Sequence, residues 1–133
     1  MTRIYVPTPE GNAWQRTRAY SPAVITTGGK TIWVAGHTGT SDGKGVSLAG
    51  NFEAQARQTF TNIEKTLKNA GGSLADIVSM TVFILDVRHG DRFVEVRRDI
   101  FKENFPVSAL VTVAGFARPE IMIEIMPIAV VDA

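Results

Sequence analysis

The segment that most constrains this fold is an almost uninterrupted apolar run near the end of the chain. The run, Ile121–Val131, contains one charged residue, Glu124. Its branched side chains predict a buried or half-buried β-strand, and it is too short to cross a membrane as a helix. An unpaired carboxylate inside such a strand is costly to desolvate. Glu124 must therefore find a hydrogen-bond donor or a cation, or face a wet cavity, where a carboxylate is a natural general base.

Hydrophobic periodicity in the rest of the chain predicts a β-β-β-α-β-α-β-β order. Apolar residues at spacings of three and four predict a helix over residues 52–70, with Asn51 as its N-cap. A second amphipathic helix, which carries Phe93, Val96 and Ile100 on one face, ends before Pro106. The strand-like runs cover residues 1–6, 23–27, 31–35, 78–85, 108–113 and 122–131.

Glycines and prolines predict how these elements are joined. Gly28 and Gly29 separate two strand-like runs and predict a β-hairpin, because a tight turn needs the positive φ that glycine supplies. Residues 7–20 and 36–50 are expected to be loops. Pro127 cannot donate a hydrogen bond to a neighbouring strand, so it predicts a bulge or an edge in the last strand.

This order of elements predicts a single α+β domain over residues 1–133, with two helices against one face of a mixed sheet. The other face of the sheet would still carry apolar side chains such as Trp33 and Phe83. A sheet that is apolar on both faces needs a second cover, and a small domain often finds it in another subunit. We therefore expect a homo-oligomer with clefts where its subunits meet.

Composition excludes several classes of function. The chain has no cysteine, which rules out disulfides and thiolate chemistry. Its net charge of +1 argues against a general nucleic-acid binder. No signal peptide or membrane-spanning segment is recognisable, so we expect a cytoplasmic protein that does not bind membranes. The two histidines lie in no acidic cluster, and the glycines of residues 36–45 lack the pattern of a phosphate loop; no metal or cofactor is expected.

Four stretches together resemble the Rid family, also known as YjgF/YER057c/UK114 and L-PSP. They are Tyr20-Ser21-Pro22-Ala23, TIWVAGHTG, KNAGGSLADIVSMTVFILD and VTVAGFARPEIMIEIMPIAV. The resemblance implies a chorismate-mutase-like fold and a homotrimer with a central barrel, with small-molecule sites at the subunit interfaces. It also implies an enzyme that hydrolyses reactive enamines and imines to a 2-keto acid and ammonia.

The resemblance assigns roles to individual residues of this chain. Tyr20 matches the family tyrosine and would donate a proton, and Glu124 matches the glutamate that positions or activates water. The backbone of Gly36 would line the pocket, and His37 follows it as a base or a polar contact. A loop tyrosine packed beside the hairpin and a glutamate bonded to neighbouring strand donors are the alternative, purely structural explanations.

One position departs from the family pattern. The family has P-x-R-[ST], whose arginine grips a substrate carboxylate, but here Pro106 and Val107 are followed by Ser108. One neutral hydroxyl in place of a bidentate guanidinium would cost several kcal/mol of carboxylate affinity. We therefore expect a non-standard substrate whose smaller or neutral group contacts Ser108. Arg118 leads the residues that could replace the missing charge, which are Arg118, Arg97, Arg98 and Arg88 with His89.

Three functions remain open on this evidence. The first is an enamine or imine hydrolase with Glu124 and Tyr20 as its catalytic residues. The second is a non-catalytic trimer that binds a small metabolite, which the missing arginine favours. The third is the nuclease activity once attached to part of the family, which the net charge of +1 supports poorly.

Overall fold

The computed structural model describes residues 1–133 and follows the predicted order of long elements. The strands are β1 (Thr2–Val6), β2 (Ala23–Thr27), β3 (Lys30–Trp33), β4 (Ile77–Ile84), β5 (Val107–Thr112) and β6 (Ile123–Val131). The α-helices are α1 (Ala13–Arg16), α2 (Phe52–Asn69) and α3 (Gly90–Phe101), with single 3₁₀ turns at Leu74–Asp76 and Val87–His89. None of the helices combines the length and the apolar character that crossing a bilayer requires.

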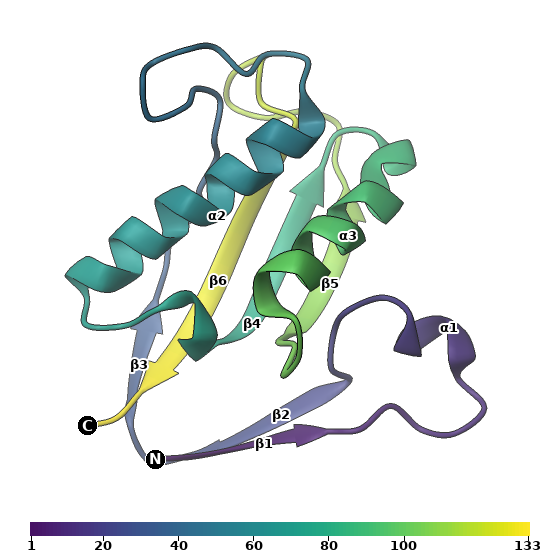
Figure 1. Cartoon of the computed structure of the whole chain (residues 1–133), viewed down its shortest axis with the longest axis vertical. Coiled ribbons are helices and arrows are strands. Elements are labelled where there is room, and N and C mark those ends of the chain that lie inside the picture. Colours follow the sequence, from purple (N-terminus) through teal and green to yellow (C-terminus); the bar gives the residue numbers. More distant parts are fainter.

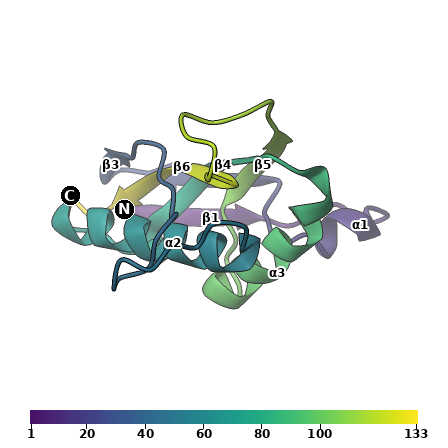
Figure 2. The same ribbon diagram turned by 90° about the horizontal axis from the view of Figure 1, so that it is seen from above.

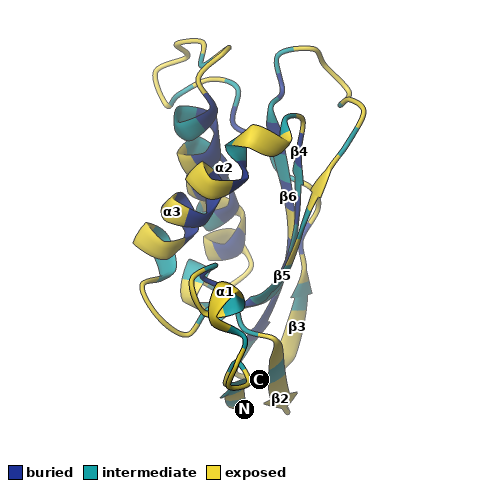
Figure 3. Ribbon diagram, turned by 90° about the vertical axis from the view of Figure 1, so that its right-hand side faces the viewer, coloured by how far each residue is buried: buried dark blue, intermediate teal, exposed yellow.

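Four strands form the central sheet in the order β3-β6-β4-β5, and α2 and α3 lie side by side on one of its faces (Figures 1 and 3). Strands β4 and β5 are parallel, whereas β6 is antiparallel to both of its neighbours. The predicted α+β architecture, with two helices on one face of a mixed sheet, is confirmed. The chain departs from it at the one-turn helix α1, which lies in the segment 7–20 predicted as a loop.

Alternation along the strands decides which side chains face the helices. Met80, Val82 and Ile84 of β4 are buried, and Ile123 and Ile125 of β6 are buried beside them. Residues two apart on a strand share a face, so these side chains form one layer. The helices contribute the opposing layer, which is made of Phe52, Ala56, Phe60, Ile63, Leu67, Phe93 and Val96.

The opposite face of the sheet carries apolar side chains that nothing in the chain covers. Trp33 is 77% exposed and Met126 is 44% exposed, and Phe83 and Ile128 are only half-buried. The connection between β5 and β6 also projects from this side, away from the helices (Figure 2). An apolar patch of this kind on a small domain is typical of an interaction surface.

The predicted hairpin around Gly28 and Gly29 is wrong. Strand β2 pairs with β1 in a separate two-stranded ribbon, and β3 pairs with β6 instead. The two glycines do have positive φ, at 73° and 82°, but the chain uses them to leave one sheet and enter the other. Strand β3 supplies hydrogen-bond partners for the backbone along one edge of β6. The side chains of β6 are mostly apolar and buried, so its backbone groups would otherwise be left unpaired away from water.

Pro127 lies in the interior of the sheet rather than at an edge, so of the two predicted alternatives the structure favours a bulge. Its carbonyl accepts a hydrogen bond from the Val34 amide at 3.3 Å, and its Cα is paired with that of Met80. The irregularity falls on the neighbouring strand, where the pairing of β4 shifts between Ile77 and Ser79. The sheet thus accommodates the missing donor of proline with a shift in β4 close by.

Helix α2 begins at the predicted cap, and this gives a first testable prediction. The Asn51 side chain accepts a hydrogen bond from the Ala54 amide at 3.1 Å. Asn51→Ala leaves that amide without its partner and is expected to lower the free energy of unfolding by about 1 kcal/mol. Urea denaturation measures the change. Asn69→Ala, at the exposed end of the same helix, is the control and should change stability by less than about 0.5 kcal/mol.

Candidate functional site

Glu124 lies on β6 with its side chain on the face of the sheet that the helices leave uncovered. It is paired with Phe83 of β4, whereas its neighbours Ile123 and Ile125 face the core. Its carboxylate forms no hydrogen bond or ion pair within the chain. The apolar strand therefore does not bury the charge among its own donors. It presents the carboxylate, half-buried, on the open face.

Gly36 makes room for this carboxylate. A Cβ atom at Gly36 would overlap the Glu124 Oε2 atom and lie only 3.0 Å from Cδ. The segment is held in place because the His37 amide donates to the Ile125 carbonyl at 2.8 Å and the Ile125 amide donates back at 3.0 Å. A glycine at this position thus brings the backbone of the glycine-rich loop directly against the Glu124 carboxylate.

A shallow cavity of about 400 Å³ opens beside Glu124. One wall is Phe83 of β4, and the rest comes from the loop that leads from β5 to β6. Arg118, in the same loop, is exposed and occupied elsewhere: it forms an ion pair with Glu120 at 3.3 Å and donates to Thr40 Oγ1 at 3.1 Å. Arg118, the leading candidate to replace the family arginine, is thus an exposed residue whose charge is already paired.

Tyr20 and Ser108 meet in a second, smaller cavity of about 220 Å³. It lies between the outer strand β5, helix α3 and the segment that follows α1. That segment is tied to β5 because the Ser21 amide donates to the Pro106 carbonyl at 3.1 Å. The residues that line the cavity are Trp14, Arg18, Tyr20, Val94, Arg97, Ser108 and Leu110.

A guanidinium group occupies this cavity at the position where the sequence lacks an arginine. Arg97 of α3 donates from Nη1 to Ser108 Oγ at 2.6 Å and from Nη2 to the Arg18 carbonyl at 2.9 Å. Burial, with the nearby charge of Arg18, lowers the pKa of Arg97 to about 10, so the group remains charged at neutral pH. Arg97, one of the arginines that could replace the missing charge, thus places a fixed cation beside Ser108.

The position of Arg97 in helix α3 carries a signal that distinguishes it from the other candidate arginines. It follows Phe93 by four residues and Val94 by three, so it lies on the side of α3 that faces the sheet. An arginine at such a position must either reach a polar partner or be excluded from the core. The lining residues that the sequence patterns did not indicate are Trp14, Arg18, Val94 and Leu110.

His37 faces away from Glu124. Its ring bonds to the Ala35 carbonyl at 2.7 Å through Nδ1 and to Thr66 Oγ1 of α2 at 2.8 Å through Nε2. The structure thus places its imidazole on the helix side of the sheet, as a link between the glycine-rich loop and α2. No group of histidine and acidic side chains in the chain is arranged to hold a metal ion.

The predicted site residues therefore form two separate groups. Glu124 and Gly36 lie on the open face of the sheet, while Ser108 is paired with Met80 and faces the helices. Tyr20 belongs with Ser108. A sheet separates the two groups within one chain, so a single copy does not bring Glu124 and Tyr20 together.

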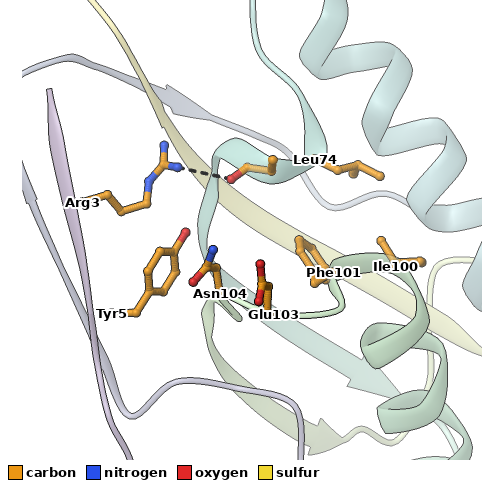
Figure 4. A pocket seen from close by; sticks show the side chains of 8 residues that line it. Arg3, Tyr5, Leu74, Ile100, Phe101, Glu103 and Asn104 are labelled. Carbon is orange, nitrogen blue, oxygen red and sulfur yellow. Dashed lines mark hydrogen bonds between the residues drawn. The ribbon is translucent and has the colours of Figure 1, made fainter.

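The largest cavity of the chain, about 420 Å³, lies elsewhere, between β1 and the end of α3 (Figure 4). Arg3 and Tyr5 of β1 face Leu74 and Phe101 across it. Its cation already has a counter-ion: Arg3 lies 3.5 Å from the Asp76 carboxylate and donates to the Val130 carbonyl at 2.8 Å, although its Nε atom has no partner. This cavity contains none of the predicted site residues and is less suited to an anionic ligand than the Tyr20 cavity.

Comparison with known proteins identifies relatives over most of the chain. The family model described as endoribonuclease L-PSP matches residues 10–131. A human protein named 2-iminobutanoate/2-iminopropanoate deaminase is 31% identical over 99 residues, which cover 74% of this chain and 71% of the relative.

Solved structures share the fold. A conserved Rid-family protein of unknown function from Yersinia pestis superimposes with a TM-score of 0.84 at 23% identity, over 98% of this chain and all of that one. The RidA protein of an Antarctic Psychrobacter species has a TM-score of 0.70 at 30% identity, covering 96% of this chain and 94% of the other.

Proposed function

This chain belongs to the endoribonuclease L-PSP family, also called the Rid family, and on that basis we propose that it hydrolyses small imines or enamines at a site shared between two subunits. The observation that carries the proposal is the division of the site residues into two groups. Each group is incomplete alone: the Glu124 group offers a base without a cation, and the Tyr20 group offers a cation and a hydroxyl without a base.

The two groups have the chemistry that imine hydrolysis requires. The Glu124 carboxylate takes a proton from water as the water oxygen bonds to the imine carbon, and the imine nitrogen takes a proton from the Tyr20 hydroxyl, which gives a carbinolamine. The carbon–nitrogen bond then breaks as protonated Glu124 gives its proton to the nitrogen, while the carbinolamine hydroxyl returns a proton to the Tyr20 phenolate and the carbonyl forms. The products are a carbonyl compound and ammonia, so one water is consumed and no oxidant or cofactor enters the balance.

The uncovered face of the sheet supports assembly into the expected homotrimer. Trp33 and Met126 are exposed on the face from which Glu124 projects. A second subunit that covers this patch would bring its own surface against the Glu124 cavity. If that surface includes the outer strand β5 with its Tyr20 cavity, one complete site forms at each interface of a closed ring.

The test is to restore activity by mixing two inactive variants. Imines are generated in solution by an amino-acid oxidase acting on 2-aminobutanoate, and their decay is followed with and without the protein. Glu124→Gln and Tyr20→Phe are each expected to lose most activity. Randomly mixed assemblies should recover about a quarter of the native activity, because each interface has one chance in four of combining two intact halves.

Other results would contradict specific parts of the proposal. If light scattering shows a monomer, or if mixed assemblies stay inactive, the shared site is wrong. If Tyr20→Phe is fully active, Tyr20 has no catalytic role. If the native protein accelerates no imine decay yet binds small metabolites, the chain is a binding module rather than an enzyme.

A further inference from the structure

We infer that Arg97 is the anion anchor of the Tyr20 cavity: its guanidinium, carried by α3 rather than by a residue of β5, binds a carboxylate of the substrate. The identity of the substrate rests on the proposed imine hydrolysis. The existence of an anion site is independent of that proposal, because it follows from the surroundings of the Arg97 side chain.

Arg97 is the only charged residue among the buried residues of the chain, with 2% of its surface exposed. The other buried polar residues, Gln55 and Thr59, are neutral and hydrogen-bonded. No carboxylate lies within ion-pair distance of Arg97, whereas Arg18 is paired with Asp91 at 2.6 Å. A buried charge is costly unless it is paired, so a guanidinium without a counter-ion indicates that the counter-ion comes from a ligand.

The guanidinium also has unused donors. A guanidinium group has five N–H donors, and the chain itself engages one on Nη1 and one on Nη2. The Nε atom is buried and has no partner. Stacking on the Phe93 ring, 5.0 Å from its centroid, favours the charged form but leaves the in-plane donors available.

The cavity around Arg97 suits a small carboxylate. It is lined by two arginines and by no acidic residue. One guanidinium presents a planar fork that matches a carboxylate, and a volume of about 220 Å³ admits only a small molecule. Tyr20 lines the same space, so an imine next to a bound carboxylate would lie near its hydroxyl. The inferred anchor favours a substrate with a carboxylate, in place of the smaller or neutral group that the sequence predicts at Ser108.

Ser108 explains why the anchor comes from α3. Its Oγ accepts the Nη1 hydrogen bond and so orients the guanidinium, and its small side chain leaves space for the Arg97 group to approach β5. An arginine at position 108 would compete for the same space. The positive charge of the cavity can therefore come from an arginine at position 108 of β5 or from Arg97 of α3, but there is no space for both.

The binding test uses 2-oxobutanoate, the keto acid that hydrolysis of 2-iminobutanoate would release, with neutral 2-butanone as its matched probe. Calorimetric titration of the native protein should detect 2-oxobutanoate and not 2-butanone. Arg97→Met, which keeps the length of the side chain but removes its charge, should weaken 2-oxobutanoate binding by about 10- to 100-fold. Arg98→Met is the control: Arg98 is the exposed neighbour that contacts the Thr17 carbonyl, and its loss should leave binding within about twofold.

A swapped variant separates an anion anchor from a merely structural contact. Arg97→Met combined with Ser108→Arg returns the guanidinium to β5, and it should recover 2-oxobutanoate binding to within about tenfold of the native protein. If Arg97 acted only through its hydrogen bond to the Arg18 carbonyl, an arginine at position 108 would not restore binding. Circular dichroism checks folding; if Arg97→Met does not fold, Arg97→Lys, which keeps the charge but loses the fork, should still weaken binding by about tenfold.

The outcomes distinguish the anchor from the proposed activity. Unchanged 2-oxobutanoate binding in Arg97→Met, equal binding of 2-butanone, or tighter binding of inorganic phosphate than of 2-oxobutanoate would each overturn the carboxylate anchor. If one of these results is obtained and the native protein still hydrolyses imines, the anchor is wrong but the proposed function is supported. Binding of 2-oxobutanoate through Arg97 without any imine hydrolysis would support the anchor and overturn the activity.

Discussion

Glu124→Gln is expected to lower kcat for imine hydrolysis by about 100- to 10,000-fold, because an amide keeps the shape of the side chain but cannot accept the proton of the attacking water. KM should change little, since the inferred substrate anchor lies in the other group of site residues. The carboxylate forms no bond within the chain, so the variant is also expected to fold with native stability. Steady-state kinetics on oxidase-generated imines measure kcat, and thermal unfolding checks the fold.

Glu120→Gln is the matched control for this experiment. Glu120 lies four residues earlier, in the loop that leads to β6, and it forms an ion pair with Arg118 on the surface. The same chemical change at that position should leave kcat within about twofold of the native value, because an exposed ion pair contributes little. Equal effects of the two substitutions, or full activity in Glu124→Gln, would remove Glu124 from the mechanism.

Gly36→Ala is expected to lower kcat/KM by about 100-fold without removing any reactive group. The added methyl group would overlap Oε2 of Glu124 and lie 3.0 Å from Cδ, so the carboxylate must move from its position. A shift of about 1 Å is enough for a loss of that size when a base must align with a water and a carbon atom. The kinetics are measured as for Glu124→Gln.

Two comparisons show whether Gly36→Ala acts through Glu124. Gly43→Ala adds the same methyl group in the same glycine-rich loop, where nothing lies within 4 Å, and it should leave kcat/KM unchanged. In a Glu124→Gln background, Gly36→Ala should cost much less than it does in the native protein, because two changes to one functional unit are not additive. Fully additive effects would show that Gly36 acts independently of Glu124.

Helices and strands of this chain are predictable from the sequence because each depends on a local pattern. The 3.6-residue period of α2 and the apolar run of β6 repeat over many residues, so errors at their ends are small. The short helix α1 was missed because four residues between prolines and polar side chains carry no period. Strand pairing was less predictable: Gly28 and Gly29 have the φ values of a turn, but the choice between β2 and β6 as the partner of β3 depends on distant residues.

The amino-acid sequence alone places one carboxylate, Glu124, in an apolar strand, and the resemblance to the Rid family shows that Ser108 stands where an arginine is usual. The first conclusion needs only the residues beside Glu124, whereas the second also needs the family pattern. The sequence patterns do not reveal that Glu124 and Ser108 lie on opposite faces of one sheet, or that Arg97, eleven positions before Ser108, reaches it from helix α3. These features depend on long-range contacts, because strand register sets the face on which a side chain lies and helix packing sets the partner of a buried charge.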